Sequence, residues 1–174
     1  MENKTKNKTR YVVTVALAAA SIECGKLALM ALPNIEVVSL LVALYGYLLG
    51  FGGVTAALIF VFIEPLLFGF GPWFVTYLIY WPSLAALFWL LGALRVKNRI
   101  AITSAAVLMT AFFGVFSSFV DLGLFSGFFD NFFERFAVYY VSGLPFYLAE
   151  IITNLVLFPI LFRPLSEMLS RILK

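Results

Sequence analysis

Long apolar runs alternate along the chain with short segments that contain charged residues, glycine or proline. A helix needs about 20 apolar residues to cross roughly 30 Å of hydrocarbon, whereas the strands of a membrane β-barrel alternate apolar and polar positions. Runs of the helical kind cover residues 11–32, 37–63, 73–94, 100–120 and 136–162. The pattern predicts an all-α integral membrane protein.

The run 37–63 is long enough to be divided by a turn at Gly50-Phe51-Gly52-Gly53, because glycine adopts the positive φ angles of tight turns without steric cost. Basic residues favour the cytoplasmic side of a membrane. With the division, ten of the 12 basic residues share one face, Arg135 lies on the other and Lys26 stays within the first span. Without it, they spread over both faces. We therefore predict a six-transmembrane-helix bundle with both termini cytoplasmic and spans at about 11–32, 34–49, 53–70, 73–94, 100–120 and 137–162.

The second of these spans is short for a membrane crossing. A short helix must be tilted, buried among its neighbours, or stop below one surface. Two prolines, Pro82 and Pro159, lie inside the fourth and sixth predicted spans, where proline removes a helical hydrogen bond and predicts a local kink.

The composition agrees with a membrane protein and excludes several functions. Hydrophobic residues make up 63% of the 174 residues and charged residues 12%, with a mean hydropathy of +1.03. So few charges cannot cover a water-facing surface, which excludes a soluble domain and a nucleic-acid binder. The chain has no histidine and a single cysteine, Cys24. We expect no catalytic triad, no His- or Cys-ligated metal and no disulfide, and we treat residues 1–174 as one domain.

Carboxylates within the apolar runs are the first candidates for chemistry, because an ionised group inside a bilayer costs at least about 2.5–3.5 kcal/mol. Glu23 and Lys26 are three residues apart on one helix face, which predicts a structural ion pair. Glu150 and Asn154 form a polar stripe with Tyr147 on the last span. Such a stripe is typical either of a ligand lining or of hydrogen bonds between helices.

Aromatic residues follow one face of the fourth predicted span, at Trp73, Tyr77, Tyr80 and Trp81. An aromatic belt at the membrane interface explains Trp73. Tyr80 and Trp81 lie two turns deeper, where a belt no longer explains them. Rings at that depth indicate a flat ligand that stacks on them.

The predicted outer loop at residues 121–135 is rich in phenylalanine and leucine. A loop exposed to water would not have this composition. We expect either a lid over a ligand or an interfacial amphipathic segment.

Together these features resemble the S components of energy-coupling factor (ECF) transporters, membrane subunits that bind a vitamin. The resemblance rests on six short spans with both termini on the cytoplasmic side, on polar residues in the last span, and on the small residues Ala16 and Ala20, which allow another helix to approach closely. Its most specific parts are Leu32-Pro33-Asn34-Ile35-Glu36-Val37-Val38-Ser39-Leu40-Leu41 and Gly143-Leu144-Pro145-Phe146.

The resemblance implies a mechanism and partners. Such a subunit lies in the plasma membrane of a bacterium, binds its cargo from outside and topples to carry it inward. It would dock through Ala16 and Ala20 onto a transmembrane scaffold subunit that two cytoplasmic ATPases drive. This chain has no Gly-x-x-x-x-Gly-Lys-Ser/Thr phosphate loop, so we expect ATP hydrolysis in the partners and no catalytic residues here.

The resemblance also implies a cargo pocket. Its candidate residues are polar and aromatic side chains in or beside the apolar runs: Asn34, Glu36, Glu64, Trp73, Tyr77, Trp81, Tyr139, Glu150 and Asn154. The group it resembles is linked to cobalamin uptake, so cobalamin is the expected cargo, as a substrate and not a resident cofactor. A queuosine precursor, flavin or pyridoxine is the alternative cargo. An intramembrane enzyme with paired carboxylates, and an accessory subunit or small channel, are the alternatives from other classes.

Overall fold

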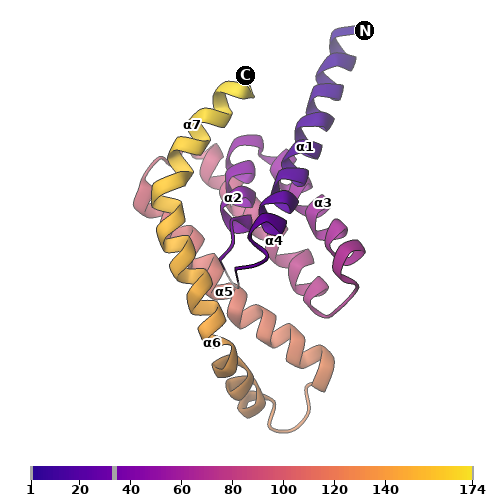
Figure 1. Ribbon diagram of the computed structural model, residues 1–174, viewed down its shortest axis with the longest axis vertical. Helices are drawn as coiled ribbons and strands as arrows, with labels where there is room; N and C mark the ends of the chain where they lie inside the picture. The colour runs from indigo at the N-terminus through magenta and orange to yellow at the C-terminus, as the bar shows by residue number, and fades with distance from the viewer. Residues whose placement is uncertain (1, 33–34, 174) are drawn as a thin grey trace.

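The computed structural model describes residues 2–32 and 35–173 and shows only helices within these ranges (Figure 1). The elements are α1 (Glu2–Leu29), α2 (Val38–Leu49), α3 (Phe51–Phe68), α4 (Trp73–Ala93), α5 (Arg99–Ser126), α6 (Phe132–Leu157), η1 (Phe158–Phe162) and α7 (Arg163–Ile172). The last three, α6, η1 and α7, form one continuous helix, in which the five residues of η1 around Pro159 adopt the wider π-helical winding.

Among the described residues, five segments are long and apolar enough to cross a membrane, namely Lys8–Leu29, Phe51–Phe68, Trp73–Ala93, Arg99–Leu124 and Phe132–Ile172. The chain is therefore an all-helical protein with the features of a multi-pass membrane protein. The expected span at 34–49 is different: α2 begins at Val38 and has 12 residues, which reach only about 18 Å at 1.5 Å per residue.

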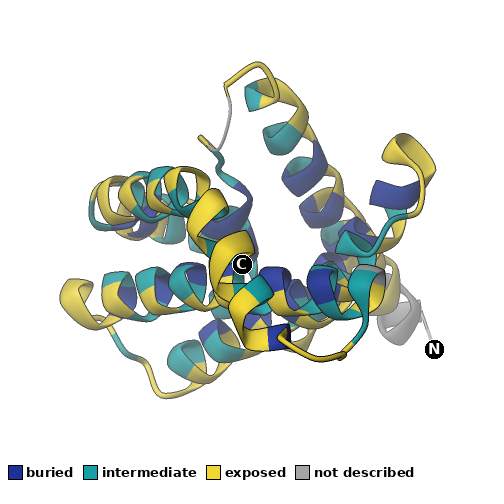
Figure 2. Ribbon diagram, turned by 90° about the horizontal axis from the view of Figure 1, so that it is seen from below, coloured by how far each residue is buried: buried dark blue, intermediate teal, exposed yellow. Residues whose placement is uncertain are grey.

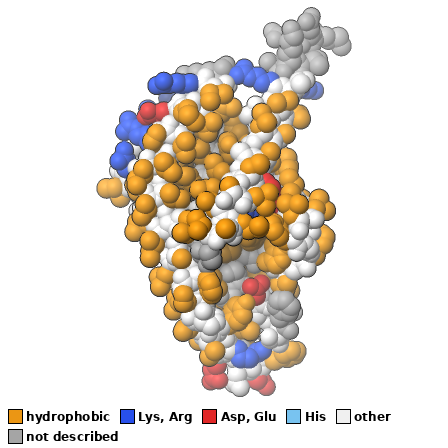
Figure 3. All heavy atoms as spheres, viewed as in Figure 1, with side chains coloured by type: hydrophobic (Ala, Val, Ile, Leu, Met, Phe, Trp, Pro, Cys, Tyr) orange, Lys and Arg blue, Asp and Glu red, His pale blue; other side chains and the backbone are white. Residues whose placement is uncertain are grey.

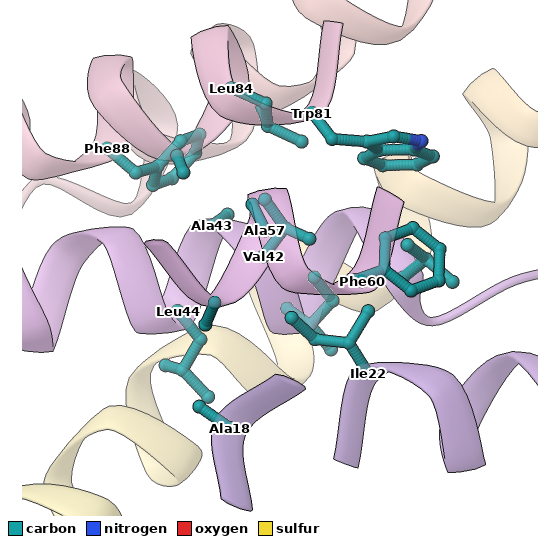
Figure 4. Packing of buried hydrophobic residues seen from close by; sticks show 14 of the residues in the cluster. Ala18, Ile22, Val42, Ala43, Leu44, Ala57, Phe60, Trp81, Leu84 and Phe88 are labelled. Carbon is teal, nitrogen blue, oxygen red and sulfur yellow. The ribbon is translucent and has the colours of Figure 1, made fainter. Parts of the chain in front are cut away.

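The short helix α2 lies in the centre of the molecule, buried among its neighbours, which is one of the three arrangements expected for a short span. Its buried residues are Val38, Ser39, Leu40, Val42, Ala43, Leu44 and Gly46. In Figure 4, Val42, Ala43 and Leu44 lie between Ala18 and Ile22 of α1 on one side and Leu84 and Phe88 of α4 on the other.

Helices α2 and α4 approach so closely that the backbone leaves no room for a side chain. A Cβ atom added to Gly46 would lie 2.3 Å from the carbonyl oxygen of Ala85, and one added to Gly92 would lie 2.3 Å from that of Tyr47. Both glycines are therefore required by packing.

The predicted division after α2 is confirmed. Gly50 has φ +60° and its N–H donates to the carbonyl of Gly46 at 3.0 Å, which ends α2. A single residue makes this break, because α3 begins at Phe51 and already includes Gly52 and Gly53.

The prediction of a long loop at residues 121–135 was wrong. Helix α5 continues to Ser126 and α6 begins at Phe132, so that only residues 127–131 connect them. The rings of Phe119 and Phe132 pack 5.5 Å apart at the tip of this hairpin, and those of Phe128 and Phe132 lie 4.9 Å apart. Contacts between the phenylalanines extend both helices past the points where the sequence alone suggests that they end.

Both chain termini lie at the same end of the molecule, and the α5–α6 hairpin projects at the other (Figure 1). Lysine and arginine side chains gather at the end with the termini, while the sides are mostly apolar (Figure 3). Exposed residues form the outer faces of the helices when the molecule is seen from the hairpin end (Figure 2). Side chains such as Leu66 (79% exposed) and Val138 (73% exposed) are suited to contact with lipid.

Candidate functional site

A cavity of about 250 Å³ lies at the end of α1 that is distant from the N-terminus, and all six helices α1 to α6 contribute to it. Its polar lining consists of Lys26, Glu36, Ser39, Thr110 and Glu150. Its aromatic lining consists of Phe60, Tyr77, Tyr80, Trp81 and Phe113. The cavity therefore combines rings and carboxylates from segments far apart in the sequence.

The aromatic wall is built mainly by α4. The rings of Tyr77 and Trp81, one turn apart, meet edge to face at 5.6 Å, and Tyr80 meets Trp81 at 4.9 Å. Phe60 of α3 and Phe113 of α5 complete the wall, with Phe60 5.9 Å from Trp81 and Phe113 4.7 Å from Tyr80. The predicted deep rings thus line a cavity, as a stacking site for a flat molecule requires.

Trp81 has an unused hydrogen-bond donor at this wall. The residue is 6% exposed, and its indole Nε1 has no hydrogen-bond partner among the described residues. A buried indole N–H normally finds an acceptor. A ligand atom with a lone pair would satisfy it.

The polar wall joins Glu36 to α5 and α6. Oε2 of Glu36 accepts a hydrogen bond from the backbone N–H of Ser39 at 2.8 Å, and its Oε1 accepts one from Nδ2 of Asn154 at 3.4 Å. The same Nδ2 also donates to Oγ1 of Thr110 at 3.1 Å. Asn154 is fully buried, so it positions Glu36 from behind the lining and also links α6 to α5.

Glu150 lies one turn before Asn154 and lines the cavity directly. Its side chain is partly exposed and takes part in no hydrogen bond or ion pair with the described residues. Tyr147, the third member of the predicted stripe, faces α5 instead, where its hydroxyl is 2.8 Å from that of Ser118. The stripe therefore lines the cavity at Glu150 and links α6 to α5 at Tyr147 and Asn154.

The predicted ion pair between Glu23 and Lys26 was wrong. Lys26 pairs with Glu64, which α3 brings to it and which is 1% exposed. The Lys26 ammonium also lies over the ring of Phe68 at 4.7 Å and that of Tyr77 at 5.6 Å. The spacing along α1 identified Glu23 and Lys26 as charged neighbours, but the ion-pair partner of Lys26 is Glu64 on α3.

The structure brings most of the predicted site residues together. Glu36, Tyr77, Trp81 and Glu150 line the cavity. Glu64, Trp73 and Asn154 lie behind it and contact lining residues: Glu64 pairs with Lys26, Trp73 meets Tyr77 at 5.2 Å, and Asn154 binds Glu36.

Two of the predicted site residues are not placed in the cavity. The Tyr139 hydroxyl donates to Asp121 at 3.4 Å beside a separate hollow near Leu122 and Arg135. Asn34 lies outside the described residues.

Sequence reasoning did not propose several of the lining residues. Tyr80 belongs to the aromatic stripe and Thr110 is a polar residue in an apolar span, so both carried a signal. Phe60 and Phe113 carried none, because the chain has 20 phenylalanines and only packing selects these two.

The proposed docking residues lie on a free face of α1. Ala16 and Ala20 are exposed, and Cys24 and Ala28 continue this face at one residue per turn. The neighbouring Ala18 and Ala19 are buried in the core instead. The face is smooth, and nothing in the described part of the chain covers it.

Comparison of the chain with protein-family models, with curated proteins and with solved structures gave no match. The cavity and the exposed face of α1 are the two features on which a function can be argued.

Proposed function

We propose that this protein is the substrate-binding membrane subunit of a micronutrient uptake transporter of the ECF type. The observation that carries the proposal is the cavity: rings from α3, α4 and α5 and the carboxyl groups of Glu36 and Glu150 converge at a site distant from the basic end of the molecule. In this proposal the basic end, with both termini, is cytoplasmic. The cavity then faces the outer side, where such a subunit takes up its cargo.

The cargo that fits this cavity is smaller than cobalamin. Small-molecule sites typically enclose about 300–1,000 Å³, and this cavity has about 250 Å³. A corrinoid, with its macrocycle, amide arms and nucleotide, needs far more room. We therefore propose a compact flat cargo of one or two rings, such as a pyridoxine-type vitamin or a queuosine precursor, in place of the cobalamin that the resemblance implied.

Transport would use the exposed face of α1. Ala16 and Ala20 leave no side chain that holds a second helix away, so a scaffold subunit can pack directly on the backbone. The proposed partners are this scaffold and two cytoplasmic ATPases, which supply the energy. Binding of the cargo itself needs only this chain.

Calorimetry on the purified protein in detergent tests the proposal. The probes are pyridoxine, pyridoxamine, the nitrile and aminomethyl forms of deazaguanine, riboflavin and cobalamin. We expect at least one compact probe to bind, with the loss of most of its affinity in Trp81→Ala.

Trp89→Ala is the matched control, because Trp89 lies on the same helix but is 44% exposed. Absence of binding by every probe, or equal losses in the two tryptophan variants, would contradict the proposal.

A further inference from the structure

The cavity carries more negative charge than its own cation can neutralise. Its lining contains two carboxylates, Glu36 and Glu150, and one ammonium, Lys26. Lys26 is already paired with Glu64, a third carboxylate that lies behind the wall. Among the described residues, no lysine or arginine forms an ion pair with Glu36 or Glu150. A carboxylate at membrane depth generally pairs with another group, so a cation from outside the chain would complete this site.

The two carboxylates differ in how far the protein satisfies them. Glu36 receives hydrogen bonds from two neutral donors, the Ser39 backbone and the Asn154 amide. These bonds hold its position and leave its charge uncompensated. Glu150 lines the cavity and receives no hydrogen bond from the described residues. A ligand with several N–H groups would reach both.

The rings of the cavity are also suited to a positive charge. Aromatic faces attract cations within about 6 Å of the ring centre. The Lys26 ammonium already uses this attraction, since it lies 5.6 Å from the ring centre of Tyr77 and 5.9 Å from that of Phe60. The same rings turn toward the cavity. Trp81, the ring type that binds cations best, lies beside them.

A second, independent observation indicates an acceptor on the same ligand. The indole N–H of Trp81 is buried at the cavity wall and has no acceptor among the described residues. Since neither a cation nor an N–H group satisfies a donor, the ligand must also present a lone pair. A ring carbonyl or a ring nitrogen meets this requirement.

We propose that the cavity selects a planar nitrogen heterocycle that carries a protonated amine. The amine and neighbouring N–H groups face Glu36 and Glu150, the ring packs within the aromatic wall, and a ring acceptor receives the N–H of Trp81. This inference rests on the proposed function and narrows its cargo to one charge class, that of molecules with a positive charge. Neutral flat molecules of the same size bind more weakly, because they leave both carboxylates without a counter-charge.

Two pairs of probes test the charge class at constant ring structure. Pyridoxamine and pyridoxine differ in an aminomethyl against a hydroxymethyl group, and the two forms of deazaguanine differ in an aminomethyl against a nitrile group, so that one member of each pair carries a protonated amine and the other does not. Calorimetry at neutral pH measures all four with the full-length protein. We expect the amine to bind at least tenfold more tightly in each pair that binds.

Glu150→Gln tests the origin of this preference. The exchange keeps the size of the side chain and breaks no hydrogen bond to the described residues, so the variant is expected to fold. It should reduce the preference for the amine to threefold or less. Glu134→Gln is the matched control, since it removes the same charge from the exposed start of α6 and should leave the preference unchanged.

The outcomes separate the two proposals. If the neutral probe of each pair binds as tightly as the amine, or if Glu150→Gln keeps the full preference, the charge class is wrong while the proposed function stands. If none of the compact probes binds in the wild-type protein, the proposed function fails, and the charge class fails with it.

Discussion

Asn154 is expected to couple the binding site to the packing of α5 and α6. Its side chain is fully buried, and its Nδ2 donates to Thr110 at 3.1 Å and to Glu36 at 3.4 Å. Replacement by leucine keeps the approximate volume and removes both bonds. The test combines Asn154→Leu, Thr110→Val and the double variant in one thermodynamic cycle.

The expected magnitude follows from the contacts. Hydrogen bonds between membrane helices contribute about 0.6 kcal/mol on average and up to about 1.7 kcal/mol. The Asn154–Thr110 bond is well within normal length, so we expect a coupling free energy of about 0.5–1.5 kcal/mol. The cost of Asn154→Leu itself is limited, because Oδ1 of Asn154 is buried with no hydrogen-bond partner among the described residues and the exchange also removes that unsatisfied acceptor.

Ligand affinity should suffer more than stability. Without Asn154, Oε1 of Glu36 loses its amide donor and the carboxylate is free to turn away from the cavity. A loss of about 1 kcal/mol corresponds to roughly a fivefold weaker affinity for a compact probe such as pyridoxamine. Thr110→Val retains the Asn154–Glu36 bond and should weaken binding less.

Equilibrium unfolding in detergent measures the cycle, and calorimetry measures binding. Thr55→Val is the control for the threonine exchange, because the Thr55 hydroxyl bonds only within its own helix, to the Phe51 carbonyl. A coupling below about 0.3 kcal/mol, the level at which independent sites add, would refute the hydrogen bond. Unchanged affinity in Asn154→Leu would refute the positioning of Glu36.

Two further predictions concern the contacts of α2 and α1. Gly46→Ala should destabilise the protein by about 1–3 kcal/mol or more in the same unfolding assay. The added Cβ would lie 2.3 Å from the Ala85 carbonyl oxygen, so α2 would have to move away from α4. Unchanged stability would contradict the close approach of the two helices. Ala16→Trp combined with Ala20→Trp should abolish co-purification of the scaffold subunit and leave probe binding intact. Leu108→Trp, at a 69% exposed position on α5, should not affect co-purification, and an equal loss there would argue against docking through α1.

Much of the fold follows from local patterns. Apolar runs locate α3 and α4 within a few residues, because each run must satisfy its own backbone hydrogen bonds in lipid, whereas α1 begins before its run and the last helix continues past its own. Gly50 marks the α2–α3 turn, since only glycine adopts its positive φ freely. The predicted helix ends are wrong at the α5–α6 hairpin, where both helices extend beyond the ends of their apolar runs. There the ring of Phe119 in α5 packs against that of Phe132 in α6.

The sequence by itself determined that this is an apolar, helical, histidine-free chain with one basic end, because composition and periodicity act on each segment separately. It also marked Trp81 as a ring too deep for an interfacial belt and Glu150 as a carboxyl group within an apolar run, while Glu36 entered through the segment that carries the resemblance. Only the tertiary structure decided which of these residues share a cavity and which partner each charge has. Lys26 is the clearest case: one turn of its own helix offered Glu23, but the packing of α1 on α3 placed Glu64 against it, and no local pattern contains that packing.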